Sequence, residues 1–111
     1  MEGSKTLHEL CEALRVTRRA VQGYEKAELV KPSDRNKYGH LLYDEQAQAR
    51  IAQIKLYQQL GFTIKEIQKL SDAPNEVVKE AIEQQIFRLK QERVRMDEVI
   101  RKAHELLEAL G

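Results

Sequence analysis

The chain of 111 residues is long enough for about one domain, and its 41% hydrophobic content is lean beside 33% charged residues. Its formal net charge of +1 does not demand a nucleic-acid partner, although residues 1–70 hold 12 Lys and Arg against 9 Asp and Glu. With a single cysteine and no long apolar run, we expect no disulfide within the chain, no signal peptide and no membrane span, hence a cytoplasmic protein.

The first predicted elements are two short helices joined by a minimal turn. Thr6 with Glu9 three residues later forms a capping box, and apolar residues at helical spacing predict a helix over residues 7–14. Thr17 is placed to cap a second helix directly after the turn. Two short helices with so short a connection are typical of a helix-turn-helix unit.

A polar hairpin and a second helix pair are predicted next. Residues 33–43 combine a polar, glycine-containing tip with an apolar returning strand, which indicates a wing beside the helix-turn-helix. Asp44 caps a third helix that ends at Gly61, and Thr63 with Glu66 forms a second capping box that opens a fourth. These elements fill the chain as far as residue 70.

A long helix is predicted from about residue 76 to residue 110. Residues 71–75 contain a proline and little apolar character, so we expect a DNA-binding domain over residues 1–73 and a dimerisation helix over residues 74–111. A heptad seam runs along this helix with nothing in its own chain to cover it, so we expect it to pair with its twin. The seam residues are Ile82, Ile86, Leu89, Arg93, Met96, Ile100, Ala103, Leu107 and Leu110.

Cationic and polar residues gather at the start of the second helix and in the hairpin, where a winged helix-turn-helix meets DNA. Each also has a simpler interpretation: paired arginines or turn charges are often only solvated, and Tyr24 either packs in the core or reaches the DNA backbone. In the context of this motif we favour contact with double-stranded DNA. The candidate DNA-binding residues are Thr17, Arg18, Arg19, Gln22, Tyr24, Arg35, Lys37 and His40.

The order of these parts resembles the MerR family of bacterial transcription regulators along essentially the whole chain. The resemblance implies a mainly α fold: a winged helix-turn-helix, a second helix pair and a long C-terminal helix that dimerises as an antiparallel coiled coil. The matching residues are Val16-Thr17, Tyr24-Glu25, Leu29, Pro32, Arg35, Gly39-His40, Tyr43, Leu60-Gly61-Phe62-Thr63 and Glu66-Ile67. Gly39-His40 and residues 57–62 and 95–98 look most like the multidrug-sensing, TipA-like branch.

Two positions depart from the family pattern. Members usually carry Arg-Tyr-Tyr or His-His-Tyr where this chain has Gln22-Gly23-Tyr24, and a cation where it has Leu41. Both changes weaken expected phosphate contacts. The sequence also stops at Gly111, without the effector domain of drug-sensing relatives, so it is either a short natural regulator or a fragment of a longer protein.

Two functions follow as hypotheses. The first is a dimeric, sequence-specific transcription regulator, associated with the bacterial nucleoid, that binds an inverted-repeat promoter site and acts by distorting the DNA. RNA polymerase is a further candidate partner. The second is an effector-less dimerisation partner that modulates full-length relatives by forming heterodimers. We expect that the protein is not an enzyme and binds no cofactor, because its sequence contains no catalytic pattern. Cys11 lies on an apolar stripe and His104 stands alone, so no metal site is expected.

Overall fold

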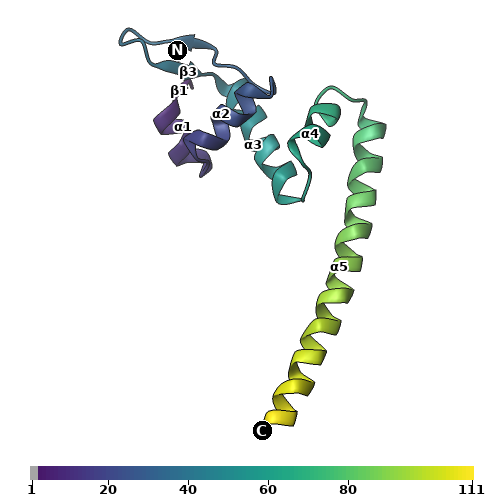
Figure 1. Cartoon of the computed structure of the whole chain (residues 1–111). Helices are drawn as coiled ribbons and strands as arrows, with labels where there is room; N and C mark the ends of the chain where they lie inside the picture. Colours follow the sequence, from purple (N-terminus) through teal and green to yellow (C-terminus); the bar gives the residue numbers. More distant parts are fainter. Residues whose placement is uncertain (1–2) are drawn as a thin grey trace. The chain divides into compact units, whose positions relative to one another are not determined.

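The computed structural model describes residues 3–111, which fall into two compact units, residues 3–72 and Ala73–Gly111. The first unit combines short helices with a small sheet, and the second is one long helix (Figure 1). In chain order the elements are β1 (Lys5–Thr6), α1 (Leu7–Leu14), α2 (Arg18–Lys26), β2 (Asp34–Arg35), β3 (Leu41–Tyr43), α3 (Glu45–Gln59), α4 (Ile64–Leu70) and α5 (Asn75–Leu110). The expected fold class, a mainly α winged helix-turn-helix followed by a long helix, is confirmed.

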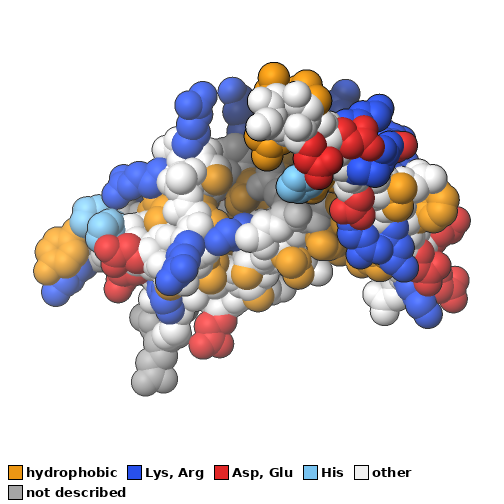
Figure 2. All heavy atoms as spheres, turned by 90° about the horizontal axis from the view of Figure 1, so that it is seen from below, with side chains coloured by type: hydrophobic (Ala, Val, Ile, Leu, Met, Phe, Trp, Pro, Cys, Tyr) orange, Lys and Arg blue, Asp and Glu red, His pale blue; other side chains and the backbone are white. Residues whose placement is uncertain are grey.

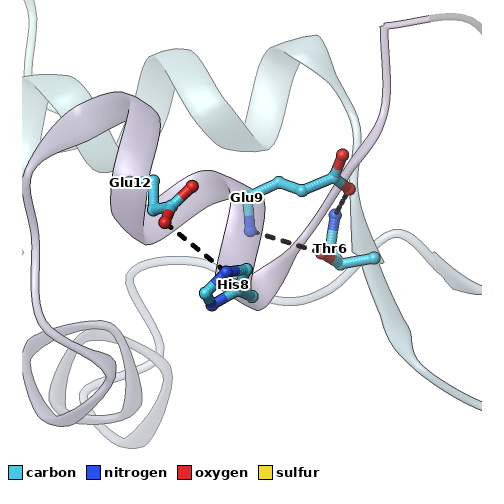
Figure 3. A network of polar contacts seen from close by, with 4 residues as sticks. All are labelled: Thr6, His8, Glu9 and Glu12. Carbon is cyan, nitrogen blue, oxygen red and sulfur yellow. Dashed lines mark hydrogen bonds and ion pairs between the residues drawn. The ribbon is translucent and has the colours of Figure 1, made fainter.

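Side-chain caps set where four of the helices begin. The predicted capping box of α1 is complete: Glu9 N donates to Thr6 Oγ1 at 3.3 Å and Thr6 N donates to Glu9 Oε1 at 2.9 Å (Figure 3). Thr63 and Glu66 repeat this arrangement at the start of α4. Thr17 and Asp44 cap α2 and α3 by accepting from a backbone N–H three residues on. These caps satisfy backbone donors that a helix leaves free at its first turn.

The wing contains one strand more than the sequence indicated. The sheet has the order β1-β3-β2, with both pairs antiparallel, so the hairpin strand β3 lies between β2 and the residues that precede α1. Lys5 pairs with Tyr43 and Thr6 with Leu42. A two-residue strand has no alternating pattern from which it could be predicted. Its pairing fixes the start of α1 against the base of the wing.

One small core holds the first unit together. Six large side chains with less than 2% exposure come from both helices of the helix-turn-helix, from β3 and from the second helix pair. Burying each large aliphatic side chain contributes roughly 1.5–3 kcal/mol. The core therefore couples every helix of this unit to the wing. The six residues are Leu10, Val21, Tyr43, Ile51, Ile54 and Ile67.

The long helix α5 has no core of its own. None of its residues is buried, and the large apolar side chains between Ile86 and Leu110 are 40% to 79% exposed. Seam residues such as Ile100 and Leu107 are 47% and 65% exposed, while Ile82 is half-buried. So long a row of exposed apolar side chains marks an interaction surface.

We predict opposite effects of alanine at two glycines. A methyl group added at either Gly23 or Gly39 would meet no heavy atom within 4 Å, so sterics do not distinguish them. Gly23 lies inside α2, where alanine should raise the free energy of unfolding by about 0.5–1 kcal/mol. Gly39 has a φ of +82°, where alanine should lower it by about 1–2 kcal/mol. Urea denaturation measures both, and changes of the same sign would contradict the assigned backbone conformations.

We also predict a loss of stability at alkaline pH that depends on Tyr43. Burial, followed by the hydrogen bond that its hydroxyl donates to Glu25 Oε1, raises the pKa of Tyr43 above the ordinary value. The folded state therefore keeps a proton that the unfolded state loses near pH 10, and the free energy of unfolding should fall as pH rises beyond about 10.

Tyr43→Phe should lower the free energy of unfolding by about 1.5–3 kcal/mol at pH 8, because it removes a hydrogen bond to a carboxylate. It should also make the decline between pH 9 and pH 11 shallower in urea titrations. Tyr38→Phe is the matched control, since Tyr38 is 72% exposed and should change neither quantity. An unaltered alkaline decline in Tyr43→Phe would rule out this tyrosine as its source.

Candidate nucleic-acid interface

The first turn of α2 presents two arginines to solvent. Thr17 Oγ1 accepts a hydrogen bond from Ala20 N at 3.0 Å, which opens the helix immediately before Arg18. Arg18 and Arg19 are exposed, and Gln22 is exposed one turn along. Cationic side chains at a helix start add to the positive end of the helix dipole and favour an anionic partner.

Tyr24 differs from the other candidates because it faces inward. Its side chain is only 3% exposed, and its hydroxyl donates to Gln58 Oε1 on α3 at 2.6 Å. Burial raises the pKa of Tyr24 above the ordinary tyrosine value. Of the two interpretations open at this position, the structure favours packing in the core.

Polar links from three other elements hold the rest of α2. Glu25 accepts the hydroxyl proton of Tyr43 on β3, so the helix is joined to the wing. Beyond the helix end, Gln68 Nε2 donates to the carbonyl of Ala27 at 2.8 Å and Arg50 Nε donates to that of Leu29 at 2.9 Å. The outer face of α2 is therefore fixed from behind, which pre-organises its exposed side chains.

The turn between α1 and α2 is tight without a glycine. Arg15 adopts a left-handed conformation, with φ of 54°, to end α1. Lys55 Nζ on α3 donates to the carbonyl oxygens of Leu14 at 2.8 Å and Arg15 at 3.0 Å. A cation that binds the last carbonyls of a helix stabilises its C-terminus. The second helix pair thus supports the turn that sets the angle between the first two helices.

The wing presents its cations around an ordered tip. Asn36 Oδ1 accepts from the backbone N–H groups of Tyr38 and His40, both at 3.0 Å. Arg35 Nη1 donates to the carbonyl of Gly39 at 2.6 Å, so one donor of this guanidinium closes the tip and others remain free for an anion. Lys37 and His40 are exposed at the same tip.

The structure brings one helix candidate, Arg18, and one wing candidate, His40, together at one hollow. A hollow of about 380 Å³ is lined by Arg18 of α2, by His40 and Leu41 of the wing, and by His8 of α1. His8 lies 3.5 Å from Glu12 in an exposed i,i+4 pair (Figure 3). Leu41, at the position where a cation is usual, contributes an apolar wall. The remaining wing candidates, Arg35 and Lys37, do not line this hollow.

Two residues that were not predicted from the sequence also lie at or near these candidates. His8 lines the hollow beside Arg18, and Tyr38 exposes 72% of its side chain at the wing tip with Lys37 Nζ 5.1 Å from its ring centroid. Tyr38 could have been selected from the sequence, because it is an aromatic residue between a lysine and a glycine in the predicted polar hairpin. The position of His8 depends on the pairing of β1, which gave no such signal.

Charged side chains of both signs are present on the face seen in Figure 2. In the face seen in Figure 2, Lys and Arg side chains project separately among acidic and hydrophobic ones, in keeping with the formal net charge of +1. Within residues 3–111, no three His, Cys, Asp or Glu side chains cluster closely enough to hold a metal ion. Cys11 is half-buried, and burial raises the pKa of its thiol. None of the described helices has the length and apolar character needed to cross a membrane.

Comparisons with known proteins identify the family. The profile of the MerR HTH family regulatory proteins matches residues 5–73. The HTH-type transcriptional activator mta of Bacillus subtilis is 33% identical over 92 residues, covering 83% of this chain and 36% of that protein. The nodulation protein NolA of Bradyrhizobium elkanii is 36% identical over 70 residues, covering 63% of this chain and 32% of that protein.

A crystal structure agrees over nearly the whole chain. It is that of MtaN, the N-terminus of the B. subtilis multidrug transporter activator, with a TM-score of 0.75 and 30% identity over 93% of this chain and 97% of that one. The chain spans about a third of the length of the curated relatives mta and NolA. From the profile match, the sequence identity and the shared fold, the chain belongs to the MerR family of helix-turn-helix regulatory proteins.

Proposed function

We propose that the protein is a dimeric, sequence-specific DNA-binding transcription regulator, with residues 1–73 binding DNA and residues 74–111 pairing two chains. The observation that carries this proposal is the fixed and exposed start of α2, where Arg18, Arg19 and Gln22 face solvent. A helix held from behind with arginines on its outer face suits the major groove. Membership of a family of DNA-binding regulators supports the same conclusion.

The exposed candidates divide into base-reading and backbone-binding roles. Arg18, Arg19 and Gln22 carry side chains that make bidentate contacts with base edges, while Thr17 lies at the helix start, where a phosphate binds. Arg35, Lys37 and His40 of the wing are assigned to the phosphate backbone, joined by His8. Tyr24 is assigned to positioning, because its hydroxyl is bound to Gln58. Tyr38 adds an aromatic surface at the wing tip.

The seam of α5 is proposed to join two such units. Residues that are exposed in the single chain, such as Leu89 and Ile100, become buried when two copies pair as an antiparallel coiled coil. A two-fold axis relating two reading helices requires an inverted-repeat site. The proposal further includes binding to a promoter, where RNA polymerase also binds, and regulation by bending and untwisting that DNA. This places the protein at the nucleoid. Residues shared with the multidrug-sensing, TipA-like branch support a place there.

A second candidate function is heterodimer formation with longer family members. It is favoured by Gly23 and Leu41, because neither supplies a phosphate contact at a position where the family usually does. A mobility-shift assay with the pure protein and the DNA flanking its own gene separates the two functions. Binding of the pure homodimer to a palindrome supports direct regulation, whereas binding only when a relative is added supports the second function.

We predict that Arg18→Ala or Arg19→Ala weakens specific DNA binding by about 1–3 kcal/mol if the arginine reads a base. If it contacts only phosphate, binding should weaken for all sequences and the dependence on salt should become less steep. Fluorescence anisotropy over a salt series measures both. Lys102→Ala, which removes an exposed cation from α5, is the control. Unchanged binding in both arginine variants would overturn the assignment of α2 as the reading helix.

We predict that Ile100→Asp converts the dimer to a monomer and abolishes operator binding. The substitution would place two unpaired carboxylates in the seam, where charge is strongly disfavoured. Gln91→Asp introduces the same side chain on the opposite face of α5 and should leave the dimer intact. Sedimentation velocity at micromolar concentration reports the mass of each variant. Monomeric wild-type protein in this experiment would contradict both the two-fold arrangement and the inverted-repeat site.

A further inference from the structure

Charged residues flank the seam of α5 in a regular order. The helix is continuous over Asn75–Leu110, so residues seven apart lie on one face along its whole length. One flank of the seam carries Glu83, Lys90, Asp97 and His104, all exposed. Acidic, basic, acidic and basic side chains thus alternate along this flank. Flanking positions of a coiled coil select how two helices align.

A parallel pair of α5 helices would bring like charges together. In a parallel coiled coil each seam residue faces its own copy, so Arg93 would lie against the partner's Arg93. The opposite flank of one helix would then face this flank of the other and place Glu92 beside the partner's Asp97. Like charges at facing positions are destabilising, so the charge pattern disfavours the parallel arrangement.

In an antiparallel pair, this flank of one helix faces the same flank of the partner helix. One helix can slide along the other only in steps of a whole heptad if the two seams are to stay in contact. With the two-fold axis between residues 94 and 95, Lys90 faces the partner's Asp97 and Glu83 faces the partner's His104. Within the seam, Leu89 then meets the partner's Ile100, and every seam residue lies beside the partner helix.

The neighbouring alignments lose this complementarity. Sliding one helix past the other by a whole heptad moves the two-fold axis by half a heptad. Moving the axis towards the C-terminus in this way places Asp97 against the partner's Asp97. Moving it the other way places Lys90 against the partner's Lys90 and sets Leu110 opposite residue 72, which precedes the first residue of α5. Each shift therefore replaces an attraction with a repulsion across the two-fold axis.

Arg93 is also accommodated in the central alignment. It faces the partner's Met96, whose unbranched side chain adapts to an irregular neighbour. The aliphatic stem of Arg93 can cover apolar surface while its guanidinium reaches the partner's Asp97. The charged residue that interrupts the seam thus finds an acidic group in this alignment.

From these juxtapositions we infer that two copies of α5 pair antiparallel about an axis between residues 94 and 95, in a register selected by Lys90 with the partner's Asp97 and Glu83 with the partner's His104. The inference rests on the dimer of the proposed function and adds the alignment of its helices and the charges that choose it.

Complementary charge reversal in the full chain tests the register. Lys90→Glu alone sets two acidic groups against each other at both symmetry-related sites, and Asp97→Lys alone sets two basic groups against each other there. When the two variants are co-expressed, a mixed dimer restores opposite charges at both sites. Native mass spectrometry at low salt measures the ratio of mixed dimer to homodimers. This ratio should exceed its value for random pairing by roughly tenfold, since several flanking pairs change sign together.

Two further mixtures serve as controls. Glu98→Lys with Lys102→Glu reverses charges on exposed positions away from the seam and should give the random 1:2:1 distribution. Wild type mixed with Asp97→Lys should also be random in the inferred register. A preference for the mixed dimer there would mean that Asp97 faces its own copy, which overturns the register.

The outcomes separate the dimer from its alignment. A wild-type monomer in the mass spectrum would contradict the proposed dimer itself. A stable wild-type dimer combined with a random distribution of the Lys90→Glu and Asp97→Lys chains would leave the dimer standing and refute the register. Strong enrichment of that mixed dimer, which fades at high salt, supports the register as an electrostatic selection.

Discussion

The anchoring of α2 from its inner side is the constraint on which the rest of the first unit depends. Val21 and Tyr24 fill the core, and Glu25 binds the buried hydroxyl of Tyr43. A buried polar group is costly without a partner, so this hydrogen bond favours one position of the helix over others. With its inner face committed in this way, α2 leaves Arg18, Arg19, Gln22 and Lys26 as its exposed polar side chains.

The second helix pair has a structural role that its sequence only partly discloses. Its apolar stripe packs in the core, but its polar residues also bind the backbone at the ends of the first two helices, as Lys55 does at Leu14 and Gln68 at Ala27. Such bonds satisfy carbonyl groups at the helix C-termini and fix the geometry of the turn. Substitutions in α3 or α4 should therefore disturb the exposed face of α2 without contacting it directly.

The two units use charge differently. At the proposed DNA interface a few cations act locally, since a formal net charge of +1 provides little long-range attraction. In the proposed dimer, the alternating charges along α5 contribute little affinity individually but discriminate between alignments, because like charges are opposed in the wrong ones. A fixed alignment matters for a DNA-binding dimer, since it sets the separation of the two reading helices.

The sequence by itself determined the helices of the first unit, because Thr6, Thr17 and Thr63 cap them locally and apolar spacing marks their inner faces. It also determined the long helix with its seam. Only the tertiary structure decided that Lys5–Thr6 adds a third strand, that Tyr24 is bound to Gln58, and that His8 joins Arg18 and His40 around one hollow. These features arise from contacts between residues distant in the chain, and neither local propensity nor periodicity encodes such contacts.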